Sequence, residues 1–115
     1  MHELAICRGI ITQVTAIAAE HNAQHVDRIY LKIGPLSGVE PDLLRSAFPI
    51  ASARSVASDA ALVIQSLPIR VHCKSCHAES EVAINKIICG HCGDWQTELV
   101  SGDELLLERV ELEIH

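Results

Sequence analysis

Apolar residues recur every three or four positions near the start of the chain, which places them on one face of a helix. They are Leu4, Cys7, Ile11, Val14 and Ala18. The pattern predicts a helix over roughly residues 3 to 21, with Glu3 complementing the dipole at its start and Asn22 ending it. Because Cys7 lies on the apolar face, we interpret it as a buried small hydrophobic residue rather than a reactive thiol.

The period changes to two over residues 26 to 34, where Ile29, Leu31 and Ile33 alternate with polar residues. This alternation predicts a half-buried strand. A second helix is expected to begin with Pro41 at its first position. Pro49 falls on the face of that helix opposite its apolar residues, so we expect a kink there rather than an end.

Two further strands are expected, over residues 61 to 71 and 105 to 114. Pro68 has no N–H to donate to a sheet, so it indicates an edge or a bulge. The predicted fold class is α+β, with two helices packed on a three-stranded sheet and a zinc-ribbon-like subdomain inserted before the last strand. The predicted domains are residues 1–71 with 101–115, and an inserted zinc-binding subdomain over 72–100.

The insertion carries two Cys-x2-Cys motifs separated by twelve residues. The four residues are Cys73, Cys76, Cys89 and Cys92. Two such knuckles can present four sulfurs to one ion, and Zn²⁺ suits a tetrahedral sulfur cage. A segment this short has too few apolar residues to fold by burial alone, so the metal is expected to supply the missing free energy.

The same cage argues against an enzyme. Four thiolates close the coordination sphere, whereas a catalytic zinc keeps one position open for water. Cys73, Cys76 and His77 also match the attachment pattern of c-type haem, but the second knuckle disfavours that interpretation. A redox dithiol is disfavoured as well, because neither cysteine pair lies in a thioredoxin-like strand–helix context.

Three histidines, His72, His77 and His91, neighbour the cysteines. One interpretation makes them surface residues or hydrogen-bond donors to the metal ligands. The other has one of them replace a cysteine as pH changes, because imidazole titrates near neutrality.

The charge balance of the chain limits the kinds of partner that it is expected to bind. The 115-residue chain carries 15 acidic and 9 basic residues, a net charge of -6, which argues against nucleic acid and favours a protein or a cation. Its start lacks the basic region of a signal peptide, and no apolar run approaches the length of a membrane span. We therefore expect a cytoplasmic protein, whose thiols stay reduced and favour metal over disulfides.

The first three residues, Met1, His2 and Glu3, are a second candidate site. The α-amine, the following amide nitrogens and the His2 imidazole can converge on one ion, and Ni²⁺ and Cu²⁺ accept such a nitrogen-rich set. The alternative is a frayed, solvated chain end. A helix beginning at Glu3 favours the metal site because it holds these groups on a rigid element.

Four features of the chain are informative together: Met1-His2-Glu3-Leu4, Leu31-Lys32-Ile33-Gly34, Val39-Glu40 and the paired knuckles. In combination they resemble the HypA/HybF family of hydrogenase maturation nickel metallochaperones, and the resemblance covers essentially the whole chain. Two departures are Pro49 inside the second helix and His77 after the first knuckle, where small residues are common.

The resemblance implies Ni²⁺ as transient cargo at the Met1 amine, the His2 side chain and the backbone of His2 and Glu3. It implies a structural Zn²⁺ on the four cysteines. The implied partners are a nickel-handling GTPase and the large subunit of [NiFe]-hydrogenase, with Glu40 at a position associated with partner docking. The competing hypothesis is a zinc-ribbon adaptor that binds protein without metal cargo, and a nucleic-acid zinc ribbon is a poorer third. Whether the chain is a monomer or a homodimer, and whether a urease is also supplied, stay open.

Overall fold

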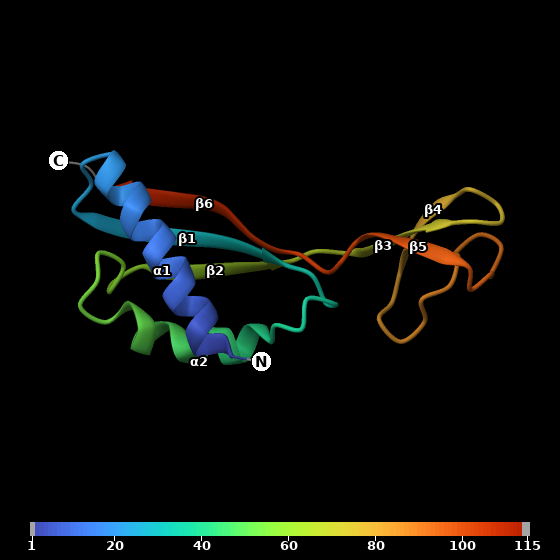
Figure 1. Cartoon of the computed structure of the whole chain (residues 1–115), viewed down its shortest axis with the longest axis horizontal. Helices are drawn as coiled ribbons and strands as arrows, with labels where there is room; N and C mark the ends of the chain where they lie inside the picture. The colour runs from blue at the N-terminus through green and yellow to red at the C-terminus, as the bar shows by residue number, and fades with distance from the viewer. Residues whose placement is uncertain (1, 114–115) are drawn as a thin grey trace.

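The computed structural model of the protein describes residues 2–113. Over this range it contains two helices and two three-stranded sheets, and the sheets lie end to end in a molecule of 55 × 25 × 16 Å (Figure 1). The elements are α1 (Glu3–Glu20), β1 (His25–Ile33), α2 (Pro41–Ser52), β2 (Ala61–Ser66), β3 (Ile69–Cys73), β4 (Glu79–Val82), β5 (Thr97–Ser101) and β6 (Leu105–Glu113).

The first sheet has the order β2-β1-β6, with β1 parallel to β2 and antiparallel to β6. Ile29, Leu31 and Ile33 of β1 are buried in a core that also contains Cys7 and Leu44. Residues of both helices belong to this core, so both pack on the same face of the sheet. The predicted fold of two helices on a three-stranded sheet is confirmed, as is the burial of Cys7, which is 0% exposed.

The predicted helix boundaries agree with the structure. α1 is followed by Asn22 in the left-handed conformation, at φ 55°, and α2 begins at Pro41. α2 continues through Pro49 to Ser52, so the proline does not end it. The last strand ends at Glu113 among the described residues, and the predicted contribution of Ile114 lies outside them.

The strand predicted over residues 61 to 71 is wrong, because the chain changes sheets within it. β2 ends at Ser66, and the Leu67 N–H still donates to the Ile33 carbonyl at 2.9 Å. Pro68 cannot donate, and from Ile69 the chain becomes the central strand of a second sheet with order β4-β3-β5. The alternation misled because apolar residues continue on both sides of the break. Leu62 and Ile64 of β2 are half-buried against the core of the first sheet, whereas Ile69 and Val71 of β3 are buried in the second.

Where the two sheets meet, Gly34 lies against the backbone of Gly102. A Cβ at Gly34 would lie 2.1 Å from the Gly102 carbonyl oxygen, which accepts the Leu36 N–H at 2.7 Å. The close approach of these two backbones therefore requires a glycine at position 34.

Gly34→Ala is expected to lower the free energy of unfolding by about 3 kcal/mol, because the neighbouring backbone must move. Gly9→Ala is the matched control, since Gly9 is in α1 and a Cβ there meets nothing within 4 Å. The control is expected to raise helix stability by about 1 kcal/mol. Denaturant unfolding followed by circular dichroism measures both, and equal stabilities for the two variants would contradict the close approach.

Candidate metal centre

The four cysteines converge at one end of the second sheet. Their sulfur atoms all lie within 4.8 Å of one another, with 3.5 Å between Cys73 and Cys92 and 3.6 Å between Cys76 and Cys89. In a tetrahedral zinc site with Zn–S bonds of about 2.3 Å, the sulfurs lie about 3.8 Å apart. Both the donor set and the spacing therefore fit a four-coordinate metal such as zinc.

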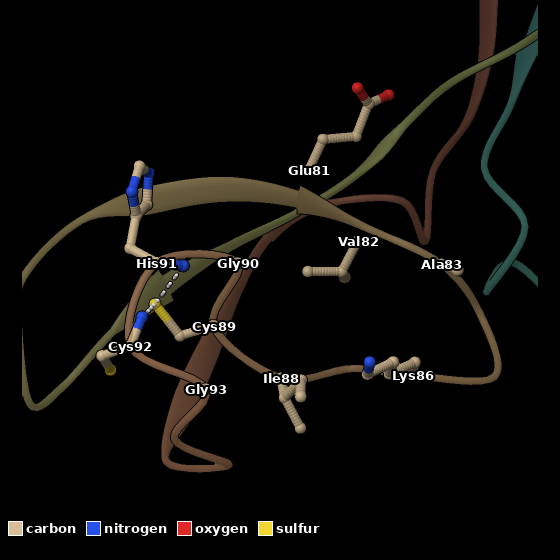
Figure 2. Close-up of a pocket in the computed structure, with 10 residues that line it drawn as sticks. All are labelled: Glu81, Val82, Ala83, Lys86, Ile88, Cys89, Gly90, His91, Cys92 and Gly93. Atoms are coloured by element: carbon tan, nitrogen blue, oxygen red, sulfur yellow. Dashed lines mark hydrogen bonds between the residues drawn. The ribbon is translucent and has the colours of Figure 1, made fainter.

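Backbone N–H groups point at the first sulfur of each knuckle. The Cys73 sulfur accepts from Ser75 and Cys76 at 3.4 Å, and the Cys89 sulfur accepts from His91 and Cys92 at 3.3 and 3.4 Å (Figure 2). The Cys92 and His91 N–H groups lower the pKa of Cys89 to about 6, and those of Cys76 and Ser75 lower the pKa of Cys73. These N–H groups therefore favour the thiolate forms of Cys73 and Cys89, and the thiolate is the form that binds a metal.

Both knuckles close with the same turn. The Gly93 N–H donates to the Cys89 carbonyl at 3.0 Å, and the His77 N–H donates to the Cys73 carbonyl at 3.0 Å. Gly93 has φ +79° and His77 has φ +63°. The first knuckle thus holds a side-chain-bearing residue in a left-handed conformation, at a cost of about 1–2 kcal/mol.

Ser75 and Asp94 connect the two knuckles, and the sequence analysis missed them. The Ser75 hydroxyl donates to one carboxylate oxygen of Asp94, and the other accepts the Gln96 N–H at 3.1 Å. These hydrogen bonds, led by that from Ser75, lower the pKa of Asp94. The sequence does contain a signal for this link: Ser75 lies inside the first knuckle, and Asp94 follows the second knuckle by two residues.

The three histidines lie outside the sulfur cluster. Among residues 2–113 the only group with metal-binding geometry is that of the four cysteines. His72 is half-buried, with its ring centroid 6.0 Å from that of His77, and the His91 ring extends away from the Cys89 sulfur (Figure 2). The exchange of a histidine for a cysteine stays a prediction.

The start of α1 lies beside α2, far from the second sheet (Figure 1). His2 is exposed and precedes α1, and its carbonyl accepts the Ile6 N–H at 3.1 Å. Glu3 is only 6% exposed, and its carboxylate accepts the Glu40 N–H at 3.4 Å. Met1 lies outside the described residues. The His2 side chain is therefore exposed to solvent, while the neighbouring Glu3 side chain anchors the backbone at this point to Glu40.

The comparisons with known proteins decide the family. A family model described as hydrogenase/urease nickel incorporation, metallochaperone, HypA matches residues 1–112. The chain belongs to the HypA family. The predicted resemblance is thus confirmed, and the family's role is that of a metallochaperone in nickel incorporation.

Individual relatives agree with this assignment. The chain is 46% identical to the hydrogenase maturation factor HypA of Nitrosospira multiformis over 97% of both chains, and 36% identical to that of Aquifex aeolicus over 99% of both. It resembles the solution structure of the Ni metallochaperone HypA from Helicobacter pylori, with 26% identity, 97% of both chains covered and a TM-score of 0.69. A second solution structure of a HypA protein gives a TM-score of 0.74 at 26% identity, over 98% of this chain and 97% of the other.

Proposed function

We propose that this HypA-family chain binds Ni²⁺ at its N-terminus and delivers it to the large subunit of [NiFe]-hydrogenase. The proposed ligands are the Met1 α-amine, the His2 imidazole and the amide nitrogens of His2 and Glu3. The observation that carries the proposal is an exposed His2 immediately before a helix whose first side chain, Glu3, is buried. The first N–H groups of a helix have no acceptor within it, so an amide nitrogen there can release its proton to solvent and bind Ni²⁺ without breaking a helical hydrogen bond.

This arrangement suits a carrier that must also release its metal. The Glu3 carboxylate holds the start of α1 against Glu40, while His2 stays accessible to a recipient. A chain end can open locally without unfolding the domain, so release need not disturb the core. Protons compete with Ni²⁺ for the amine and the imidazole, so affinity is expected to fall as pH falls.

The four cysteines are proposed to hold a structural Zn²⁺, because a closed sulfur site leaves no position for substrate. We propose a division of the chain that follows the two metal sites. Residues 1–71 with 101–115 form a nickel-binding domain, and residues 72–100 form a zinc-binding subdomain.

Among residues 2–113, none of the helices has the length and apolar character that a membrane crossing requires. We propose that the chain acts in the cytoplasm, where reducing conditions keep the thiols available.

The proposed partners are a nickel-handling GTPase and the hydrogenase large subunit. Glu40 is exposed at the start of α2, and its N–H is bonded to the Glu3 carboxylate. A partner that contacts Glu40 would therefore touch the element that anchors the nickel-binding residues. This link supports Glu40 as part of the docking surface.

The test compares untagged protein with a variant extended by two residues before Met1. X-ray absorption of the untagged protein loaded with both metals is expected to show nickel with nitrogen and oxygen ligands and zinc with four sulfurs. The extension is expected to abolish tight nickel binding, because the terminal amine is displaced, while one zinc per chain remains. Nickel held by sulfur, or unchanged nickel affinity in the extended variant, would overturn the proposal.

A second candidate is an adaptor that uses the second sheet to bind protein without carrying nickel. Large apolar side chains are exposed in this part of the chain: Val100 of β5 is 50% exposed, and Ile84 and Trp95, between β4 and β5, are 57% and 74% exposed. An adaptor would be indifferent to the N-terminal extension and would contain no second metal by elemental analysis.

A further inference from the structure

The sulfur cluster has a buried side and an exposed side. Cys73 and Cys89, the first cysteine of each knuckle, are buried, whereas Cys76 and Cys92, the second cysteine of each, are exposed. A hollow of about 540 Å³ lies against the second knuckle and has Cys92 in its lining (Figure 2). A competing metal ion or a chelator therefore reaches the cluster from the side of Cys76 and Cys92.

Backbone hydrogen bonds close each knuckle on itself. The Cys73 N–H donates to the Ala78 carbonyl at 2.9 Å, and the Cys89 N–H donates to the Asp94 carbonyl at 2.8 Å. Ala78 and Asp94 each lie two residues after the last cysteine of the same knuckle. These bonds shape the two knuckles separately, so they do not fix the angle between one knuckle and the other.

Other hydrogen bonds join the first knuckle to the segment that follows the second. The Lys74 N–H donates to the Gln96 carbonyl at 2.9 Å, and the Ser75 hydroxyl donates to the Asp94 carboxylate. The other Asp94 carboxylate oxygen accepts the Gln96 N–H at 3.1 Å, which fixes the direction of the carboxylate. Ser75 directly precedes the exposed Cys76, so its hydroxyl ties the exposed side of the first knuckle to the second.

The angle between the knuckles decides the geometry that the four sulfurs offer to a metal. Each knuckle supplies two sulfurs, and in a tetrahedral site the plane of one pair with the ion is perpendicular to that of the other pair. In a square-planar site the two planes coincide. Four-coordinate Zn²⁺ sites are tetrahedral, whereas Ni²⁺ favours planar coordination. Nickel in the cluster would therefore require one knuckle to rotate against the other, and the hydrogen bond between Ser75 and Asp94 opposes that rotation.

We propose that Ser75 and Asp94 are positioning residues that keep Ni²⁺ out of the cysteine site. Their hydrogen bond holds the two knuckles at the angle that suits Zn²⁺, so the nickel that the chain carries stays at its N-terminus. A nickel carrier with four thiols in the same chain needs such a barrier, because thiolates also bind Ni²⁺. This role rests on the proposed function, since zinc at the cysteines and nickel as cargo are its premises.

Untagged, zinc-loaded chain incubated with excess Ni²⁺ tests the role of the two residues. Elemental analysis of protein separated from free metal at successive times gives its zinc and nickel content. Sulfur-to-nickel charge-transfer absorption in the near ultraviolet reports nickel at the cysteines, and nickel bound only by nitrogen at the N-terminus does not give it. Ser75→Ala and Asp94→Ala are each expected to exchange zinc for nickel at least about tenfold faster than the unaltered chain, an effect typical of residues that orient metal ligands.

A swapped variant and two controls separate this role from a general loss of structure. Ser75→Asp combined with Asp94→Ser again places a hydroxyl opposite a carboxylate, so slow exchange is expected to return. Ser101→Ala removes a different serine hydrogen bond, to the Pro68 carbonyl at 3.2 Å, at the other end of the second sheet. Asp103→Ala removes one exposed charge after β5. Both controls are expected to exchange zinc at the rate of the unaltered chain.

The role is refuted if the unaltered chain and Ser75→Ala exchange zinc at the same rate, or if the swapped variant exchanges as fast as the single variants. Its failure is distinguishable from that of the proposed function. An unaltered chain that holds no zinc before the incubation, or no nickel after it, contradicts both. One zinc and one nickel per chain, with an exchange rate that does not depend on Ser75, contradicts the role of Ser75 and Asp94 alone.

Discussion

Replacing Cys73 with serine is expected to unfold the second sheet while the first sheet stays folded. Four residues between positions 68 and 101 are buried, all within the described range, and two of them, Cys73 and Cys89, are proposed metal ligands. Little apolar burial is left to offset the conformational entropy of these residues. Structural zinc sites contribute on the order of 10–16 kcal/mol, so the metal is expected to decide whether this sheet forms.

Serine is a poor zinc ligand because its hydroxyl stays protonated at neutral pH. The zinc content of Cys73→Ser is expected to fall from one per chain to none by elemental analysis. Amide hydrogen exchange is expected to show lost protection in β3, β4 and β5, and retained protection in β1, β2 and β6. The first sheet persists because its core, which contains Ile29, Leu31 and Leu44, is separate from the sulfur cluster.

Lys74→Ser is the matched control, because it alters the same knuckle without removing a ligand. Lys74 forms a surface ion pair with Glu98 at 3.6 Å, which is worth less than about 1 kcal/mol. The control is expected to keep its zinc and its exchange protection. Full protection of β3 in zinc-free Cys73→Ser would show that the sheet folds without metal.

Replacing His2 with alanine is expected to weaken Ni²⁺ binding by at least about 100-fold, because the imidazole is a proposed ligand. Loss of a residue that only orients a metal ligand typically weakens binding by about 10- to 100-fold. The His2 side chain is exposed and supports no packing, so the fold is expected to be unchanged. Isothermal titration of untagged protein with Ni²⁺ measures the effect, and elemental analysis checks that one zinc per chain remains.

His21→Ala is the matched control, since His21 is also exposed and lies just after the other end of α1. Its nickel affinity is expected to equal that of the unaltered chain. Equal affinities for His2→Ala and His21→Ala would place the nickel elsewhere and contradict the N-terminal site.

Local patterns predicted the parts of the fold that depend on neighbours in sequence. The helical spacing around Cys7 and Val14 predicted α1, and the alternation through Ile29 to Ile33 predicted β1. The knuckle spacing predicted the sulfur cluster, because a Cys-x2-Cys turn aims both of its sulfurs to the same side. These features are short in range, so the sequence carries their signal directly.

Local sequence patterns did not predict the second sheet. β4 reads Glu-Ser-Glu-Val and has no apolar alternation of its own, so its pairing with β3 depends on the turn that the cysteines impose. Local patterns also did not predict the break at Pro68. Apolar residues continue on both sides of it, and only the strands with which the chain pairs change. Strand partners are tertiary information, and a single strand does not encode them.

Sequence patterns predicted the ligands of both candidate metal sites: four thiols at knuckle spacing, and a histidine at position 2. How each set of residues is held depends on tertiary contacts. It brought the Cys73 sulfur to 3.5 Å from that of Cys92, and it buried Glu3 against the Glu40 amide, 37 residues further along the chain. The helix pattern predicted Glu3 only as a charge in the first turn of α1. Its anchoring role arises because α2 packs beside the start of α1, a contact that no local pattern specifies.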